Sequence, residues 1–331
     1  MATEHVLVGA AAKIPVSSPA SPIISFAPVI IPSPGRAAEL RVRVTMPAGG
    51  GDGAPLPVIL LSHGHGRSNW LSSLQGYAPL AEFWAKHGFA VLQPTHLTSR
   101  TLGVAAAAAA GDEMHWRSRP GDMSRILDHL DAVEAAVLDL LAGRRLDRGR
   151  VAVAGHSFGG MTASLLLGAR NTDPRDGAVF DGREGRIRAG VVLAGTGNGG
   201  SGDLSESGRA MVPFYGMDFA AMAAPALVVG GDADVSPHLT ARGADWHWDA
   251  YTHGPGPKDL LVVRGGRHGL GGVSGWDAAE TQDESPEMLG MVQRMTWAYL
   301  RSQLYEGDES WERACEVLAG LKDLGFVESK R

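Results

Sequence analysis

The chain lacks the residues and segments that mark secreted or membrane proteins. It has one cysteine, Cys315, among 331 residues, so an intramolecular disulfide is impossible. No run of about 18 apolar residues occurs, which predicts that no helix spans a membrane. The N-terminal segment carries Glu4 and His5 and lacks a basic stretch followed by a long apolar one, so we expect no signal peptide. These absences favour a cytoplasmic location.

Positive charge is also scarce. Lysine and arginine total 30 against 36 aspartate and glutamate residues, which gives a formal net charge of −6, and no basic stripe is visible. This balance argues against nucleic acids and anionic membranes as partners. Hydrophobic residues make up 44% and charged residues 20% of the chain, as in globular proteins, and the length suits one α/β domain. Nothing in the sequence predicts an oligomeric state.

The order of apolar segments predicts a mostly parallel sheet. Residues 1–20 are rich in Ala, Pro and Ser and predict an extended or mobile N-terminal arm, followed by a single α/β domain over residues 21–331. Ile23–Ile31 and Leu40–Thr45 predict an antiparallel pair of strands. Strands and helices alternate after this pair, as in sheets covered on both faces. The expected strands are Val58–Leu61, Ala90–Leu92, Val151–Ala154, Gly190–Leu193, Ala226–Val229 and Leu260–Val263.

Helical periodicity occurs between these strands. One long helix is expected over Asp122–Ala142, with Asp122 as its N-cap and Gly143 as its stop. Residues 99–120, which include the alanine run Ala105–Ala110 (helix or loop), and residues 171–187 predict insertions that could form a small lid. The other expected helices are Pro79–Lys86, Met161–Leu167, Met288–Leu304 and Trp311–Leu321.

The most informative motif is the segment Gly155–Gly160, with the sequence Gly-His-Ser-Phe-Gly-Gly. It follows the apolar run Val151–Ala154 and precedes a helix of small residues, the strand–turn–helix context of a nucleophile elbow. Its outer glycines allow a sharp turn, with Ser157 at the tip and a helix N-terminus behind it. The alternative is a glycine-rich turn that carries an incidental serine.

A serine nucleophile requires a base, and the base requires an orienting carboxylate. In this architecture the acid and then the histidine follow later strands. Asp232 and Asp234 both follow the strand Ala226–Val229. We favour Asp234 as the acid, because it lies farther into the returning loop, whereas Asp232 suits a turn-capping role.

His268 is the expected base. It lies in a glycine-rich loop directly after the strand Leu260–Val263. His247 and His253 precede that strand and are poorly placed, and His156 is expected to point away from its neighbouring serine.

Backbone N–H groups are expected to form an oxyanion hole. The donors would be Phe158, which follows the nucleophile, and His65, in the loop after the strand Val58–Leu61. Gly64 and Gly66 would let the backbone approach closely.

Two further patterns suggest cofactors, and we favour neither. His63 and His65 could be read as a metal-binding pair, but Gly66–Asn69 supplies no good further ligands. Gly195–Gly200 matches a dinucleotide fingerprint, but the polar segment after it shows no apolar helical stripe. We therefore expect no metal and no cofactor.

The substrate pocket is weakly marked. Large side chains lie in loops near the expected site, although each could equally pack under those loops. These candidate substrate-binding residues are Trp70, Met161, Trp116, Trp246 and Trp276. No cluster of cationic residues indicates a substrate with a charged acyl group. Arg67, near the expected mouth of the site, leaves such a substrate open as an alternative. We expect an uncharged or weakly acidic small-molecule ester with a modest acyl chain.

These motifs resemble the α/β-hydrolase superfamily, and within it the serine esterases similar to platelet-activating-factor acetylhydrolase, chlorophyllase and dienelactone hydrolase. The resemblance implies an α/β-hydrolase fold with a mostly parallel eight-stranded sheet, a triad of Ser157, Asp234 and His268, and no cofactor. True dienelactone hydrolases have cysteine at the position of Ser157. The segments that carry the resemblance are Ser62–Gly66, Gly88–His96, Arg119–Met123, Gly155–Gly160, Gly231–Pro237 and Gly266–Gly269.

The expected function is cleavage of a carboxylic ester through an acyl-enzyme. Lactone, thioester, polyester or amide hydrolysis and a cofactor-free lyase or cyclase reaction use the same residues. Parts of the sequence are also compatible with a metallohydrolase or with a ligand-binding scaffold that catalyses no reaction.

Overall fold

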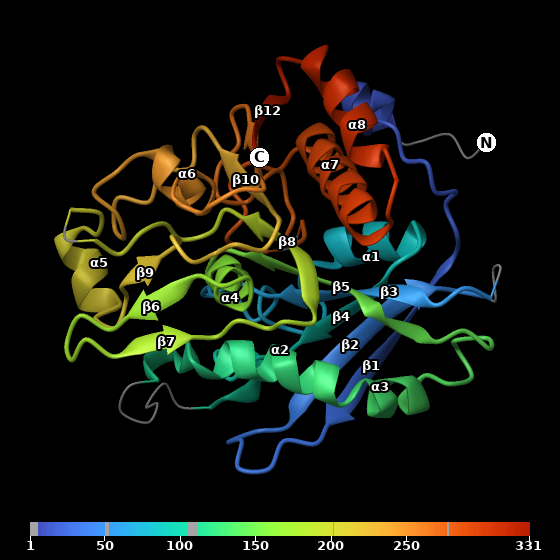
Figure 1. Cartoon of the computed structure of the whole chain (residues 1–331), viewed down its shortest axis with the longest axis horizontal. Coiled ribbons are helices and arrows are strands. Elements are labelled where there is room, and N and C mark those ends of the chain that lie inside the picture. Colours follow the sequence, from blue (N-terminus) through green and yellow to red (C-terminus); the bar gives the residue numbers. More distant parts are fainter. Residues whose placement is uncertain (1–5, 50–52, 105–111, 201, 277) are drawn as a thin grey trace.

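The computed structural model describes residues 6–49, 53–104, 112–200, 202–276 and 278–331. A twisted nine-stranded sheet forms its centre, with helices on both faces (Figure 1). The spatial order is β1-β2-β4-β3-β5-β8-β10-β11-β12. The strands span Ile23–Ile31 (β1), Leu40–Pro47 (β2), Leu56–Ser62 (β3), Ala90–Pro94 (β4), Leu146–His156 (β5), Ile187–Leu193 (β8), Ala226–Gly231 (β10), Lys258–Val263 (β11) and Gly325–Lys330 (β12).

The parallel core of the sheet consists of the six strands predicted from apolar runs. Neighbours among β4, β3, β5, β8, β10 and β11 pair in parallel. The predicted antiparallel pair β1–β2 is confirmed, and β2 and β12 pair antiparallel with β4 and β11. The sheet has nine strands rather than the expected eight. The short segment Gly325–Lys330 becomes β12 because β11 offers it an edge, and its mixed charges mask the strand in the sequence.

A second, antiparallel sheet lies apart from the main one. It has the order β7-β6-β9, with β6 at Arg170–Thr172, β7 at Val179–Asp181 and β9 at Met217–Asp218. Residues 171–187, expected as a lid insertion, contribute to β6 and β7. The other expected lid, residues 99–120, contains the short 3-10 turns η2 (Arg100–Leu102) and η3 (Glu113–His115) and the start of α2, and its alanine run Ala105–Ala110 lies outside the described residues.

Alternating side chains along the strands separate two hydrophobic layers. In β3, Val58 and Leu60 belong to one cluster and Ile59 and Leu61 to the other. The first cluster packs under α2 (Ser118–Asp128), α3 (Leu130–Ala136) and α4 (Phe158–Leu166). The second packs under α1 (Ala78–Lys86), α7 (Pro286–Leu304) and α8 (Ser310–Ala319), on the opposite face (Figure 1). The remaining short helices are α5 (Glu206–Met211), η4 (Ala244–Trp248) and α6 (Asp249–Thr252).

The helix predicted over Asp122–Ala142 is wrong in its bounds. The chain forms α2 and α3, which are separated at His129, where φ is −115° and ψ is 28°. No proline or glycine marks this break, so the sequence carries no signal for it. Asp122 is not an N-cap but a buried residue inside α2.

The N-terminal segment lies on α7. Val6–Lys13 forms the 3-10 element η1 where the sequence predicts an extended or mobile arm. The Ala10 N–H donates to Glu287 Oε1 over 2.6 Å, and Arg294 donates to the Ile14 carbonyl over 2.6 Å. None of the helices in the described part of the chain has the length and apolar character needed to cross a membrane.

Candidate functional site

The site forms where parallel strands end at one edge of the sheet. Ser157 follows β5, Asp234 follows β10, His268 follows β11, and His65 follows β3. Carboxyl ends of neighbouring parallel strands meet at the same edge, which is where α/β proteins place their ligands. Sheet topology therefore brings together residues that are far apart in the sequence.

Ser157 lies on a strained turn between β5 and α4. Its φ of 57° and ψ of −120° are rare for a residue with a Cβ atom. The Ser157 N–H donates to the Leu193 carbonyl of β8 over 2.9 Å, which anchors the turn to the sheet.

Close backbone contacts explain the flanking glycines. A Cβ atom on Gly155 would lie 1.9 Å from the Gly159 carbonyl oxygen, and one on Gly159 would lie 2.1 Å from the Ser62 carbonyl oxygen. A larger residue at either position would push the strand and helix apart.

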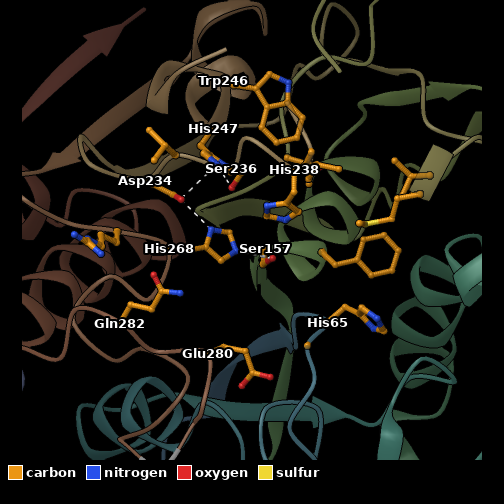
Figure 2. A pocket seen from close by; sticks show the side chains of 18 of the residues that line it. His65, Ser157, Asp234, Ser236, His238, Trp246, His247, His268, Glu280 and Gln282 are labelled. Carbon is orange, nitrogen blue, oxygen red and sulfur yellow. Dashed lines mark hydrogen bonds and ion pairs between the residues drawn. The ribbon is translucent and has the colours of Figure 1, made fainter. Parts of the chain in front are cut away.

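A chain of hydrogen bonds connects the three residues of the expected triad. His268 Nε2 lies 2.8 Å from Ser157 Oγ, and His268 Nδ1 donates to Asp234 Oδ2 over 2.9 Å (Figure 2). The Asp234 side chain is 2% exposed, whereas that of His268 is 39% exposed and faces the cavity. Asp232 instead accepts from the Gly265 N–H.

The two ionisable groups shift each other's pKa. Desolvation lowers the pKa of His268, but the hydrogen bond to Asp234 and the charge of that carboxylate outweigh it, so the pKa is raised above the usual 6.5. Desolvation likewise raises the pKa of Asp234, but the hydrogen bond from His268 and the charge interactions with the neighbouring histidines together outweigh it, so the pKa is lowered. Asp234 is therefore ionised at neutral pH and favours positive charge on His268.

His247 is a second histidine beside the Asp234 carboxylate. Its position before β11 in the sequence made it a poor candidate for the base. Its Nδ1–H donates to the Gly195 carbonyl over 2.7 Å, while Nε2 lies 3.3 Å from Ser236 Oγ and 3.5 Å from Asp234 Oδ2. Burial lowers the pKa of His247, so the ring is neutral and its Nε2 accepts from the Ser236 hydroxyl.

These groups also form a possible metal-ligand set. Within the described residues, the ligand atoms of Asp234, His247 and His268 all lie within 4.8 Å of one another. An ion bound there would displace the hydrogen bond between His268 and Asp234, because the two ligand atoms of that bond would both face the metal. The set can hold a metal only in competition with the Ser157–His268–Asp234 chain.

The ring nitrogens of His156 bind groups other than Ser157 and connect two loops of the site. Its Nε2–H donates to the His268 carbonyl over 2.6 Å, and its Nδ1 accepts from the Tyr77 hydroxyl over 2.8 Å. The Tyr77 oxygen in turn accepts from the Gly64 N–H over 3.0 Å. The loops after β3 and β11 are thereby connected through buried, neutral groups.

The two residues expected to supply the oxyanion donors follow different strands, β3 and β5. His65 and Phe158 both line the cavity beside Ser157. Within the described part of the chain, neither backbone N–H donates a hydrogen bond. His63 is not available to a metal, because its Nδ1–H donates to the Gly64 carbonyl and its Nε2 accepts from the His96 N–H.

A cavity of about 780 Å³ opens above Ser157, a volume usual for small-molecule sites. Of the five candidate substrate-binding residues, Trp246 lies in its lining (Figure 2). Trp116 and Met161 are buried in the core, and Trp116 stacks on Phe214 with a ring separation of 5.3 Å. Trp70 and Trp276 are partly exposed and lie outside the lining.

The apolar wall of the cavity comes from segments that sequence reasoning missed. They are α5 with its flanking residues and the loop after β10, and of these the sequence indicated only the part after Gly195–Gly200, as a polar segment. Their scattered apolar residues showed no period from which a wall could be predicted. The wall residues are Leu204, Met211, Val212, Tyr215 and Leu239.

Comparison of the chain with models of known protein families finds no match. A search among curated proteins finds no relative either.

Proposed function

We propose that the protein is a serine hydrolase that cleaves a carboxylic ester through an acyl-enzyme. The observation that carries this proposal is the hydrogen-bonded chain from Ser157 through His268 to Asp234 at the floor of an apolar cavity. The resemblance of the sequence motifs to α/β-hydrolases supports the same reaction class.

In the first step, Ser157 Oγ attacks the ester carbonyl while His268 Nε2 takes the hydroxyl proton. Asp234 stabilises the resulting imidazolium. The N–H groups of His65 and Phe158 donate to the oxygen that becomes negative in the tetrahedral intermediate. Collapse of this intermediate breaks the bond to the leaving alkoxide, which receives the proton from His268.

In the second step, water attacks the acyl-enzyme. His268 takes a proton from the water, and the same backbone donors hold the second tetrahedral intermediate. Collapse releases the carboxylic acid and returns the proton to Ser157 Oγ, so the enzyme regains its starting state.

The cavity favours an uncharged ester with a sizeable apolar group. Its apolar wall would bury such a group, and each buried methylene contributes about 0.8 kcal/mol. Lactones, thioesters, polyesters and amides would use the same groups, so a panel of substrates with acyl chains of varied length, followed by pH-stat, tests the substrate class.

A fluorophosphonate probe tests the reaction class. We expect labelling of the wild type at Ser157 and none of the Ser157→Ala variant, whose ester hydrolysis should fall by several orders of magnitude. Ser164→Ala is the matched control, because Ser164 lies in α4 and its buried hydroxyl makes no hydrogen bond within the described residues.

Two results would reject the proposal. A protein that hydrolyses no ester and resists the probe would be a binding scaffold. Ester hydrolysis that a chelator abolishes, with Ser157→Ala still active, would indicate a metallohydrolase.

A further inference from the structure

Buried polar side chains behind the loop that follows β3 take no direct part in the proposed acyl transfer. Their centre is Arg119 in α2, which is fully buried. Its Nη2 donates to the His63 carbonyl and, over 3.2 Å, to Ser62 Oγ. Its Nη1 donates to Thr98 Oγ1 over 2.6 Å, and its Nε donates to Thr162 Oγ1 over 2.9 Å. Each nitrogen of the guanidinium therefore binds a different segment of the chain.

We propose that Arg119 is a positioning residue that aligns the two backbone N–H groups of the oxyanion hole, an inference that rests on the proposed function. The His63 carbonyl precedes the His65 donor by two residues, so its bond to Arg119 orients this part of the loop. Thr162, which accepts from Arg119, donates its own hydroxyl proton to the Phe158 carbonyl over 3.2 Å. One rigid guanidinium thus holds both donor segments.

The position of the Phe158 ring supports this role. The guanidinium carbon of Arg119 lies 4.7 Å from the centre of the ring, which lines the cavity beside Ser157. Such a contact is favourable for a desolvated cation. Arg119 therefore supports Phe158 through both its backbone and its ring.

A chain of hydrogen bonds connects Arg119 to a buried carboxylate. Because Ser62 Oγ accepts from Arg119, its own proton is directed to His96 Nε2, 3.0 Å away. His96 Nδ1–H then donates to Asp122 Oδ2 over 2.9 Å, and Arg36 donates to the other oxygen of Asp122 over 2.9 Å. Burial lowers the pKa of Arg119 to about 9, so it remains a cation at neutral pH. The Arg119–Met123 motif thus holds the loop after β3 at a defined position.

Arg119→Lys and Arg119→Met test the proposal on an ester that the wild type hydrolyses. Lysine keeps the charge but lacks the planar fork of the guanidinium. We expect both variants to lose about tenfold to hundredfold in kcat. This loss is a part of the ~10²–10³-fold loss in kcat that follows removal of one oxyanion donor. KM should change little, and the acid limb of the pH profile should stay in place, because Asp234 and His268 are untouched. Affinity for phenylboronic acid, which forms a tetrahedral adduct on Ser157, should fall in parallel with kcat.

Arg144→Lys is the matched control. Arg144 is also buried, and it donates to the Pro47 carbonyl over 2.6 Å near the opposite end of β5. We expect this variant to lower the free energy of unfolding and to keep the wild-type kcat. If the Arg119 variants do not fold, Thr162→Val removes two hydrogen bonds of the network, from Arg119 Nε and to the Phe158 carbonyl, at nearly constant shape and should still lower kcat several-fold.

Wild-type kcat and boronate affinity in a folded Arg119→Lys or Thr162→Val variant would overturn the positioning role. That result leaves the hydrolase proposal intact, because it requires an active wild type. Absence of wild-type hydrolysis and labelling would instead reject the proposed function itself.

Discussion

His156 donates its Nε2–H to the backbone carbonyl of His268 over 2.6 Å. The residue that precedes the proposed nucleophile therefore holds the backbone of the proposed base. The other ring nitrogen of His156 accepts from Tyr77, so the hydrogen bonds suit a neutral ring. Burial, followed by the charge of His268, lowers the pKa of His156 to about 3.

This buried ring predicts acid-sensitive stability. In the unfolded chain His156 binds a proton near pH 6.5, whereas in the folded protein it binds one only near pH 3. The stabilisation is therefore present above pH 6.5 and is lost as the pH falls, by about 2 kcal/mol at pH 5. Urea unfolding at pH 7.5 and pH 5.0 measures this loss.

The loss should be smaller by about 2 kcal/mol in His156→Gln, since glutamine does not titrate. His238→Gln, at an exposed histidine, should retain the full pH dependence. An identical loss in the wild type and His156→Gln would contradict the assignment of this effect to His156.

Ester hydrolysis should fall on the acid side of a pKa above 6.5. His268 acts as a base only when neutral, and Asp234 raises its pKa. In Asp234→Asn the acid limb should move to lower pH, and kcat should drop by up to ~10⁴-fold, as when the orienting carboxylate of a serine protease triad is lost. Profiles of kcat/KM between pH 5 and pH 9 check both effects, and a flat wild-type profile would contradict them.

The two histidines beside Asp234 should differ in their effect on activity. His268 Nε2 faces Ser157 Oγ, whereas His247 Nε2 faces Ser236 and the carboxylate. We expect His268→Gln to abolish turnover and His247→Gln to retain more than about a tenth of it, because the neutral His247 ring takes no part in proton transfer. Steady-state assays at pH 8 compare them, and the reverse order would make His247 the base.

The turn at Ser157 should not tolerate a side chain at Gly155. Its Cβ would lie 1.9 Å from the Gly159 carbonyl oxygen, so Gly155→Ala should lower the free energy of unfolding by about 3 kcal/mol or more. Gly121→Ala in α2 is the matched control. Nothing lies within 4 Å of a Cβ there, and alanine should stabilise the helix by about 0.5–1 kcal/mol. Urea unfolding measures both, and equal effects would refute the steric argument.

A charge in the cavity wall should discriminate between substrates. Met211 lines the cavity and is 53% exposed, so Met211→Glu can fold. We expect kcat/KM for a long-chain ester to fall roughly tenfold and that for an acetyl ester to change little, because only the long chain contacts the wall. Val179→Glu, at an exposed strand residue outside the cavity lining, is the control. Equal losses on both esters would place the acyl group elsewhere.

Local patterns predicted the parts of the fold that depend on short segments. The six apolar runs became the parallel core, since such runs are stable only when covered on both faces. The turn at Ser157 could also be predicted from the sequence, because glycines are required where backbones approach closely. The strand β12 and the break at His129 could not be predicted from the sequence, because each depends on neighbouring elements rather than on local composition.

The sequence by itself determined the order of the strands along the chain and the residues at their carboxyl ends, including Ser157, Asp234 and His268. Only the tertiary structure decided that His247 lies beside Asp234, that Arg119 binds both the loop after β3 and α4, and that residues near α5 form part of the cavity wall. The reason is physical: strand and turn preferences act over a few residues, whereas burial and hydrogen bonding across loops depend on how distant segments pack.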